Sequence, residues 1–214
     1  MIVVDIETSN GNNFERAGVW QIGALDLNNP SNTFFDEGRI DEEDTTTEDA
    51  LKAIGKTEEE LRDRNKQSQK ELIEKFFSWC EKIGKTNFLC HNPQFDYAIL
   101  YIRAARYRVK FPVDYRCFDL HSVAQAVYSR IKGELLIEAG KSGFYLGKIL
   151  EFCGVEDPRI IINNGKIVKE GDPHNGLTDA KLEAECFYRL ICGRNLLPEY
   201  SRFEIPDYLK EIMN

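Results

Sequence analysis

The segment Val3-Val4-Asp5-Ile6-Glu7-Thr8 places two carboxylates inside a run that otherwise has the composition of a buried strand. Successive side chains of a strand point to opposite faces, so Asp5 and Glu7 face the same way as Val3. Two carboxylates about 7 Å apart at their Cα atoms repel each other, and in a partly buried site they take up protons unless a cation lies between them. A solvated edge strand is the simpler explanation for any single D-x-E pattern, because charges on an edge prevent pairing with another chain.

The composition is that of an ordinary globular chain and predicts a single domain. The 214 residues are 42% apolar and 30% charged, which is enough for one substantial core. No apolar run approaches the roughly 20 residues of a membrane span and no basic leader opens the chain, so we expect a cytoplasmic protein without membrane association. The six cysteines form no C-x-x-C pair, which predicts reduced residues and no zinc site. The net charge of −8 argues against bulk attraction to a polyanion but allows a local basic groove.

The hydrophobic pattern predicts strands first and then helices mixed with short strands. The predicted strands cover residues 2–7, 19–27, 33–37 and 87–90, with the first three as an antiparallel meander and a turn at 28–31. The predicted helices cover 68–83, 119–131 and 144–152, one that Pro93 opens with Asn92 as its cap, and a last long helix with apolar residues from 177 to 191. Residues 160–168 have the turn chemistry of a β-hairpin, and 41–69 are expected to form surface helices and loops. This order favours a mixed sheet with helices packed on it.

Two further acids stand near the starts of predicted helices. Asp96 lies in the first turn or so of the helix that Pro93 opens, and Asp179 begins the last long helix. An aspartate at such a position gains roughly 0.3 to 1 kcal/mol from the helix dipole, which explains either one taken singly. Both nevertheless lie at the edge of an apolar stripe. His174 stands five residues before Asp179 on a segment that ends in Gly176, so a loop can bring its imidazole over the carboxylates.

Taken in order, these acids and the histidine resemble the catalytic set of the DEDDh group of DnaQ-like 3′-to-5′ exonucleases. The three motifs of that family match residues 3–8, 91–96 and 174–179, and the resemblance spans residues 2–192. The segments 21–24 and 143–150 agree further with the family. The resemblance implies an α/β, RNase H-like fold: a mixed five-stranded sheet with the first three strands antiparallel and helices on both faces. It also implies one exonuclease domain over residues 1–214, with a hairpin insertion near 158–170.

The resemblance implies two divalent metal ions, Mg²⁺ or Mn²⁺, which prefer hard oxygen ligands. Asp5, Glu7 and Asp179 would hold the ion that carries the attacking water, while Asp5 would bridge to a second ion that Asp96 supports. Two such ions about 3.5 to 4 Å apart stabilise both the attacking and the leaving oxygen of a phosphodiester. His174 would accept the proton of the water as general base.

The implied substrate is the 3′ end of a single-stranded nucleic acid, from which nucleoside 5′-monophosphates are released. Thr8, Asn92 and Phe95 match family positions near the terminal nucleotide, although Phe95 also belongs to an apolar stripe and fits a core equally well. Ser9-Asn10-Gly11 departs from the family, because many relatives have a Thr-Gly-apolar segment there whose large side chain wedges against the last bases.

Other features of the sequence keep more than one interpretation. His91 fits either a supporting role in the site or a local backbone hydrogen bond, and the hairpin near 158–170 fits a specificity arm over the site. Two basic groups fit either a path for the phosphate backbone or ordinary solvated helix ends; they are Arg103, Arg106, Arg108 and Lys110, and Lys141 with Lys148. Proofreading beside a polymerase, RNA trimming and clearance of short oligonucleotides all fit the resemblance, as do a homodimer and a catalytically weak nucleic-acid-binding scaffold.

Overall fold

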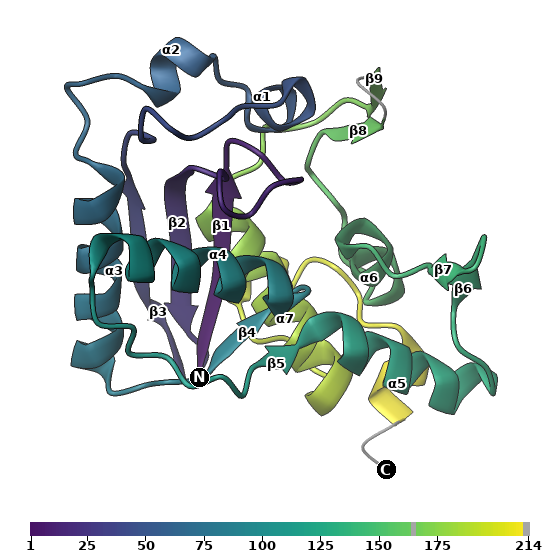
Figure 1. Cartoon of the computed structure of the whole chain (residues 1–214). Coiled ribbons are helices and arrows are strands. Elements are labelled where there is room, and N and C mark those ends of the chain that lie inside the picture. Colours follow the sequence, from purple (N-terminus) through teal and green to yellow (C-terminus); the bar gives the residue numbers. More distant parts are fainter. Residues whose placement is uncertain (164–165, 212–214) are drawn as a thin grey trace.

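A five-stranded mixed sheet forms the centre of the molecule in the computed structural model, which describes residues 1–163 and 166–211 (Figure 1). The strand order is β3-β2-β1-β4-β5, with β1 antiparallel to β2 and parallel to β4. The strands are β1 (Ile2–Thr8), β2 (Val19–Asp26), β3 (Asn29–Glu37), β4 (Phe88–Cys90) and β5 (Phe118–Asp119). The predicted sheet, with its first three strands antiparallel, is therefore confirmed.

Helices cover both faces of this sheet, with α4 on one side and α7 on the other (Figure 1). The helices α3 (Gln69–Ile83) and α4 (Pro93–Tyr107) pack on the face that carries Ile2 and Val4. The other face, which carries Val3, packs against α5 (Leu120–Lys132), α6 (Leu146–Phe152) and α7 (Gly176–Cys192). Because Asp5 and Glu7 share a face with Val3, the alternation along β1 directs both acids toward the α7 side.

The remaining elements are short and lie around these two layers. They are the helices α1 (Glu48–Ile54), α2 (Glu58–Leu61), η1 (Pro198–Tyr200) and α8 (Asp207–Lys210), and the hairpins β6 (Ile137–Glu138) with β7 (Lys141–Ser142) and β8 (Ile161–Asn163) with β9 (Lys166–Lys169). The predicted hairpin at 160–168 is present as β8 and β9, and its turn residues 164 and 165 lie outside the described residues. In the described part of the chain, no helix is both long and apolar enough to cross a membrane.

Helix starts follow the expected chemistry in α3 but not in α4. Ser68 caps α3 in a reciprocal capping box with Glu71, which confirms the predicted start of that helix. Asn92 precedes α4 with a φ of 61° and makes no side-chain cap; its Nδ2 lies 3.3 Å from Nδ1 of His91 instead. Asn92 is thus the N-cap residue, as predicted, but its left-handed backbone leaves it without the expected side-chain bond to the first helical N–H groups.

Several predicted boundaries also differ from the structure. β3 begins at Asn29, which pairs with Asp26, so the chain turns at residues 27–28 and not at 28–31. Pro30 is tolerated because β3 is an edge strand, where its missing N–H breaks no ladder. The strand β5 and the hairpin β6–β7 were not located from the sequence, since two-residue strands carry no measurable periodicity.

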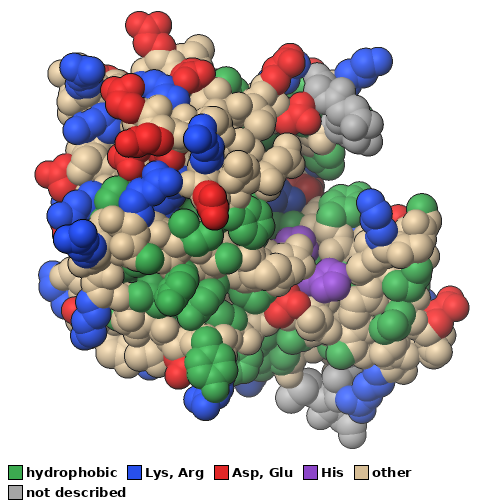
Figure 2. All heavy atoms as spheres, in the orientation of Figure 1, with side chains coloured by type: hydrophobic (Ala, Val, Ile, Leu, Met, Phe, Trp, Pro, Cys, Tyr) green, Lys and Arg blue, Asp and Glu red, His purple; other side chains and the backbone are tan. Residues whose placement is uncertain are grey.

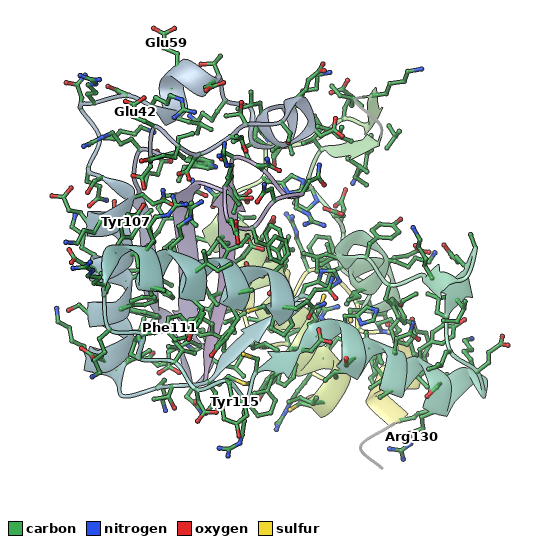
Figure 3. All side chains as sticks on the ribbon, viewed as in Figure 1. Glu42, Glu59, Tyr107, Phe111, Tyr115 and Arg130 are labelled. Carbon is green, nitrogen blue, oxygen red and sulfur yellow. The ribbon has the colours of Figure 1, made fainter. Side chains whose placement is uncertain are left out.

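The segment 41–47 is fastened to α4 by buried charge. Arg103 is fully buried and its Nη1 lies 2.7 Å from Oδ1 of Asp44, while its Nη2 donates to the carbonyl of Ala17. Arg106 Nη1 lies 3.4 Å from the same Asp44 oxygen. Tyr107, labelled in Figure 3 at the end of α4, donates its hydroxyl hydrogen to the carboxylate of Asp41. Both sequence interpretations of Arg103, as a phosphate contact or a solvated helix end, were wrong because its charge is used inside the fold.

Candidate active site

One cavity of about 480 Å³ brings together residues from β1 and from the starts of α4 and α7. All eight residues that the sequence suggested for catalysis, metal binding or substrate binding line it: Asp5, Glu7, Thr8, Asn92, Phe95, Asp96, His174 and Asp179. Figure 2 shows the hollow on this face of the molecule, with histidine side chains at its wall. Its opposite wall includes residues of α1 and Arg159, which precedes β8.

Two glycines place the start of α7 directly against the sheet. Gly23 pairs with Asp5 across β1 and β2, and a Cβ built on Gly23 would lie 1.9 Å from the backbone nitrogen of Leu177. A Cβ on Gly176 would lie 2.8 Å from the carbonyl oxygen of Asp5. Only residues without a side chain permit this approach. Asp179, one turn into α7, is thereby fixed beside the acids of β1.

A hydrogen bond ties the start of α4 to the same strand. Asp96 is 4% exposed, and its Oδ1 accepts the backbone N–H of Ile6 at 3.0 Å. Ile6 stands between Asp5 and Glu7 in the sequence, so this bond brings the Asp96 carboxylate to the strand segment that carries the other acids. The cluster is therefore held by the close backbone approach of α7 to the sheet and by the bond from the Ile6 N–H to the Asp96 side chain.

The four carboxylates hold more negative charge than the site can stabilise alone. Burial, together with the nearby carboxylates of Asp179 and Asp96, raises the pKa of Glu7 to about 8, and burial raises the pKa of Asp96 to about 7. Burial also raises the pKa of Asp5 well above its ordinary value, with the neighbouring acids adding to the effect, and burial raises that of Asp179. Such a cluster favours either bound protons or bound cations.

The oxygens of this cluster fit a divalent metal ion. Glu7 Oε1 and Asp179 Oδ1 are buried without a hydrogen-bond partner, although buried polar atoms are nearly always paired. One ligand atom each from Glu7, Asp179 and His174 lie within 4.8 Å of one another. The two unpaired carboxylate oxygens are the kind of donor that Mg²⁺ and Mn²⁺ prefer, and His174 lies beside them.

His174 lies at the edge of the acid cluster, on the loop before α7. Its Nδ1 is 3.6 Å from Oδ2 of Asp179, and its Nε2 is 3.1 Å from the carbonyl oxygen of Ile160. The backbone N–H of His174 donates to the carbonyl of Ala53 in α1 at 2.9 Å. The side chain is 29% exposed, so the imidazole is held beside Asp179 and still faces the cavity.

Comparison with known proteins identifies the fold. No family model matches the chain, and no curated protein matches it in sequence. Among solved structures, the cell-death related nuclease CRN-4 superposes with a TM-score of 0.64 at 18% identity over 91% of this chain. The nuclease domain of 3′hExo, a DEDDh family member bound to rAMP, gives 0.63 at 17% identity, covering 96% of this chain and 94% of that one. The fold is that of the DEDDh exonucleases.

A third structure with the DEDDh fold, a 3′-exonuclease that recognises the 3′ end of a histone mRNA stem-loop, has a TM-score of 0.62 and 17% identity. It overlaps 92% of this chain. The present chain spans 64% of the length of that chain and 64% of CRN-4.

Besides Asp49 of α1, two charged residues line this cavity that the sequence did not single out. Glu183 follows Asp179 by one turn of α7, is 1% exposed and has no hydrogen-bond partner for its Oε2. Its spacing of four from Asp179 is a helical signal that could have found it. Arg159 precedes β8 and is 8% exposed. No periodic signal connects Arg159 to the acids, because a β-hairpin separates it from α7 in the sequence.

His91 is part of the wall of the cavity in its neutral form. Burial lowers the pKa of His91 to about 4, and its Nε2 lies 3.3 Å from the carbonyl oxygen of Phe144. The backbone N–H of His91 donates to the carboxylate of Glu183. The structure thus favours the supporting role over a local hydrogen bond, since the ring contacts a carbonyl 53 positions away and the backbone supports a buried acid of the site.

Near the position expected for the terminal nucleotide, Phe95 contacts both the cavity and the core, whereas Ser9 and Asn10 face the segment 41–47. Phe95 lines the cavity and also packs edge to face on Phe14, with ring centroids 5.3 Å apart. Ser9 turns away from the cavity, because its Oγ donates to the carbonyl of Thr45 at 2.7 Å. Asn10 does the same, with its Nδ2 2.8 Å from the Oγ1 of Thr45. In the Ser9-Asn10-Gly11 segment, which departs from the family, Ser9 and Asn10 therefore bind the segment 41–47. Of the three residues, only Gly11 lines the cavity.

Proposed function

We propose that this protein is a metal-dependent 3′-to-5′ exonuclease that hydrolyses the last phosphodiester of a single-stranded nucleic acid and releases a nucleoside 5′-monophosphate. The observation that carries the proposal is the cluster of Asp5, Glu7, Asp96 and Asp179 in one cavity of a DEDDh fold, with two buried oxygens unpaired. Three elements of the fold hold this cluster together.

In this proposal the four acids hold two divalent ions, Mg²⁺ or Mn²⁺, which when bound supply an activated water and stabilise the charge on the attacking and leaving oxygens. Asp5, Glu7 and Asp179 would hold one ion near His174, and Asp96 with Asp5 would hold the other. The raised pKa values of Glu7 and Asp96 are consistent with this role, because a dication replaces the protons that the isolated cluster retains near neutral pH.

His174 acts as the general base in this proposal, and its contacts indicate which nitrogen takes the proton. The carbonyl oxygen of Ile160 can only accept a hydrogen bond, so Nε2, 3.1 Å away, carries the ring hydrogen. Nδ1 is then free to accept the proton of the attacking water. Asp179, 3.6 Å from Nδ1, stabilises the imidazolium that forms.

The similar proteins support nucleic acid as the substrate class. The DEDDh nuclease domain of 3′hExo binds rAMP, and the stem-loop structure contains the 3′ end of an RNA. A second hollow of about 350 Å³ continues from the cavity past Arg159 and His174 and is lined by Tyr145 and residues 160–162. We propose that the β8–β9 hairpin uses this hollow to contact the nucleotides before the terminal one. Replacing residues 161–169 by a short Gly-Ser turn should then change strand or length preference, and an unchanged cleavage profile would remove this role.

The proposal treats residues 1–214 as one domain that acts in the cytoplasm. The two hydrophobic clusters of the described residues lie on opposite faces of the same sheet, which supports a single folding unit. The six cysteines are free thiols, which suits a reducing compartment.

The proposed function is tested by incubating the protein with 3′-labelled single-stranded DNA, single-stranded RNA and dinucleotides, each with Mg²⁺, Mn²⁺ or EDTA. We expect release of mononucleotides that requires the metal, and the better substrate identifies the preferred nucleic acid. The double variant Asp5→Asn with Glu7→Gln should abolish release while the circular dichroism spectrum is retained. Glu42→Gln, a surface change with an 82% exposed side chain, is the matched control. If the intact protein releases no mononucleotide from any 3′ end, the chain is a nucleic-acid-binding scaffold and not a nuclease.

A further inference from the structure

A buried guanidinium lies in the cavity among the proposed metal ligands. Arg159 is 8% exposed and is held by a fork of two hydrogen bonds to one carboxylate: Nε to Oδ1 of Asp157 at 2.9 Å and Nη2 to Oδ2 at 3.0 Å. A bidentate pair of this kind fixes the plane of the guanidinium as well as its position. Asp157 therefore uses one edge of the group and leaves the Nη1 corner for the cavity.

The Nη1 corner is only weakly satisfied. Among the described residues it reaches one acceptor, Oδ2 of Asp179, at the long distance of 3.4 Å. Nη1 carries two hydrogens, and a buried donor normally makes good hydrogen bonds. Asp179 is at the same time a proposed metal ligand, so a bound dication competes with Arg159 for that oxygen. With the metal in place, the two hydrogens of Nη1 need a different acceptor.

The backbone around Arg159 is clamped, so the group is oriented before any ligand arrives. Ile160 donates its N–H to the carbonyl of Asp172 at 2.9 Å, and Asp172 donates to the carbonyl of Pro158 at 2.8 Å. The segment after β9 passes so close to Arg159 that a Cβ on Gly171 would lie 2.5 Å from the carbonyl carbon of Arg159. Such preorganisation lowers the entropic cost of binding an anion.

Arg159 also keeps its charge in this environment. An arginine guanidinium is not deprotonated in proteins, and here the carboxylates of Asp157 and Asp179 lie beside it. The cavity thus contains a permanent cation that the proposed two-metal chemistry does not use. An anion that enters with the substrate and carries several acceptor oxygens is its natural partner, and in a nucleic acid that anion is a phosphate.

We propose that Arg159 is a substrate-binding residue whose Nη1 donates to a non-bridging oxygen of the scissile phosphate, and that Asp157 is the positioning residue that aims it. The inference rests on the proposed function in taking that phosphate to belong to a nucleic acid 3′ end. The same phosphate leaves on the nucleoside 5′-monophosphate, so the product is a direct probe of the contact.

The test is calorimetric binding of 5′-AMP and of adenosine in the presence of Ca²⁺, with Ca²⁺ binding alone measured as well. Arg159→Lys keeps the charge but removes the planar fork. We expect it to weaken 5′-AMP binding about tenfold or more, as for a lost hydrogen bond to a charged group, while adenosine and Ca²⁺ binding change less than about threefold. Asp157→Asn should weaken 5′-AMP selectively in the same way. Arg116→Lys, an exposed arginine paired with Asp114, is the control and should leave every value unchanged.

Several results would overturn the inference. One is wild-type protein that does not prefer 5′-AMP to adenosine, and another is an Arg159→Lys variant that binds 5′-AMP as tightly as wild type. Equal losses for 5′-AMP and adenosine would also overturn it, since they indicate a structural role. If Arg159→Lys does not fold, Asp157→Asn decides by the same comparison. If the protein degrades 3′ ends but Arg159→Lys does not weaken 5′-AMP binding, this inference alone is refuted. Phosphate binding through Arg159 without any release of mononucleotides would refute the proposed function instead.

Discussion

The contact between Gly23 and the start of α7 makes a sharp prediction for Gly23→Ala. The added Cβ would lie 1.9 Å from the nitrogen of Leu177 and 2.0 Å from the carbonyl carbon of Gly176, against an ordinary contact of at least 3.4 Å. Both neighbours are backbone atoms, so the first turn of α7 has to move away from the sheet by about 1.5 Å. Asp179 moves with it. Overpacking of this kind costs roughly 1 to 3 kcal/mol of the free energy of unfolding.

The effect on the rate should be comparable in free energy to the effect on stability, because a hundredfold change in rate is about 2.7 kcal/mol. A misplacement of about 1 Å in a catalytic arrangement costs on the order of 10²-fold in rate. We therefore expect Gly23→Ala to stay folded at 25 °C, to bind Mn²⁺ more weakly by calorimetry, and to release mononucleotides on the order of a hundredfold more slowly. Gly11→Ala is the control for folding and metal binding, because a Cβ there meets nothing within 4 Å. A Gly23→Ala protein with wild-type Mn²⁺ affinity and rate would show that the glycine contact does not set the position of Asp179.

Three further predictions concern pH, buried charge and the general base. In EDTA, the free energy of unfolding should fall between about pH 5 and pH 8, because Glu7 with its pKa of about 8 stays protonated in the folded state but ionises above 4.5 when unfolded. This group alone contributes at most about 1.4 kcal/mol per pH unit, and Glu7→Gln should reduce the slope measured by denaturant titration. Arg103→Met should cost roughly 3 to 5 kcal/mol in the same titration, whereas Lys110→Ala, from an exposed pair, should leave the midpoint almost unchanged. His174→Gln should lower kcat about 10²- to 10⁴-fold with Mn²⁺ affinity unchanged, while His121→Gln, outside the cavity, changes neither.

The parts of the structure that depend on local pattern could be predicted from the sequence. The alternation along residues 2–8 correctly indicated which side chains share a face, and the apolar spacing along 68–83 located α3. Long amphipathic helices carry enough repeated signal to locate them. The five-stranded sheet followed from the family resemblance, while β5, with two residues, could not be located from its own composition.

The parts that depend on tertiary contacts could not be predicted. Arg103 looks like a surface charge because its partner Asp44 lies 59 positions away in the sequence and is brought to it by the fold. Arg159 enters the cavity because the hairpin closes on Asp172, a pairing that no residue pattern before β8 indicates. Glu183 is the exception, since its helical spacing from Asp179 was visible in the sequence and only its burial was not.

The hydrogen bond from the N–H of His174 to the carbonyl of Ala53 divides the site into two structural parts. The floor consists of the acids on the sheet and at the starts of α4 and α7, and it is fixed by the packing of α7 on the sheet and by the bond from Ile6 to Asp96. The roof consists of α1 and the loop that carries His174. The proposed metal ligands from Asp5 to Asp179 thus belong to the floor, whereas the proposed base belongs to the roof. If both proposals hold, sequence changes confined to α1 should alter turnover more than they alter the affinity for the metal.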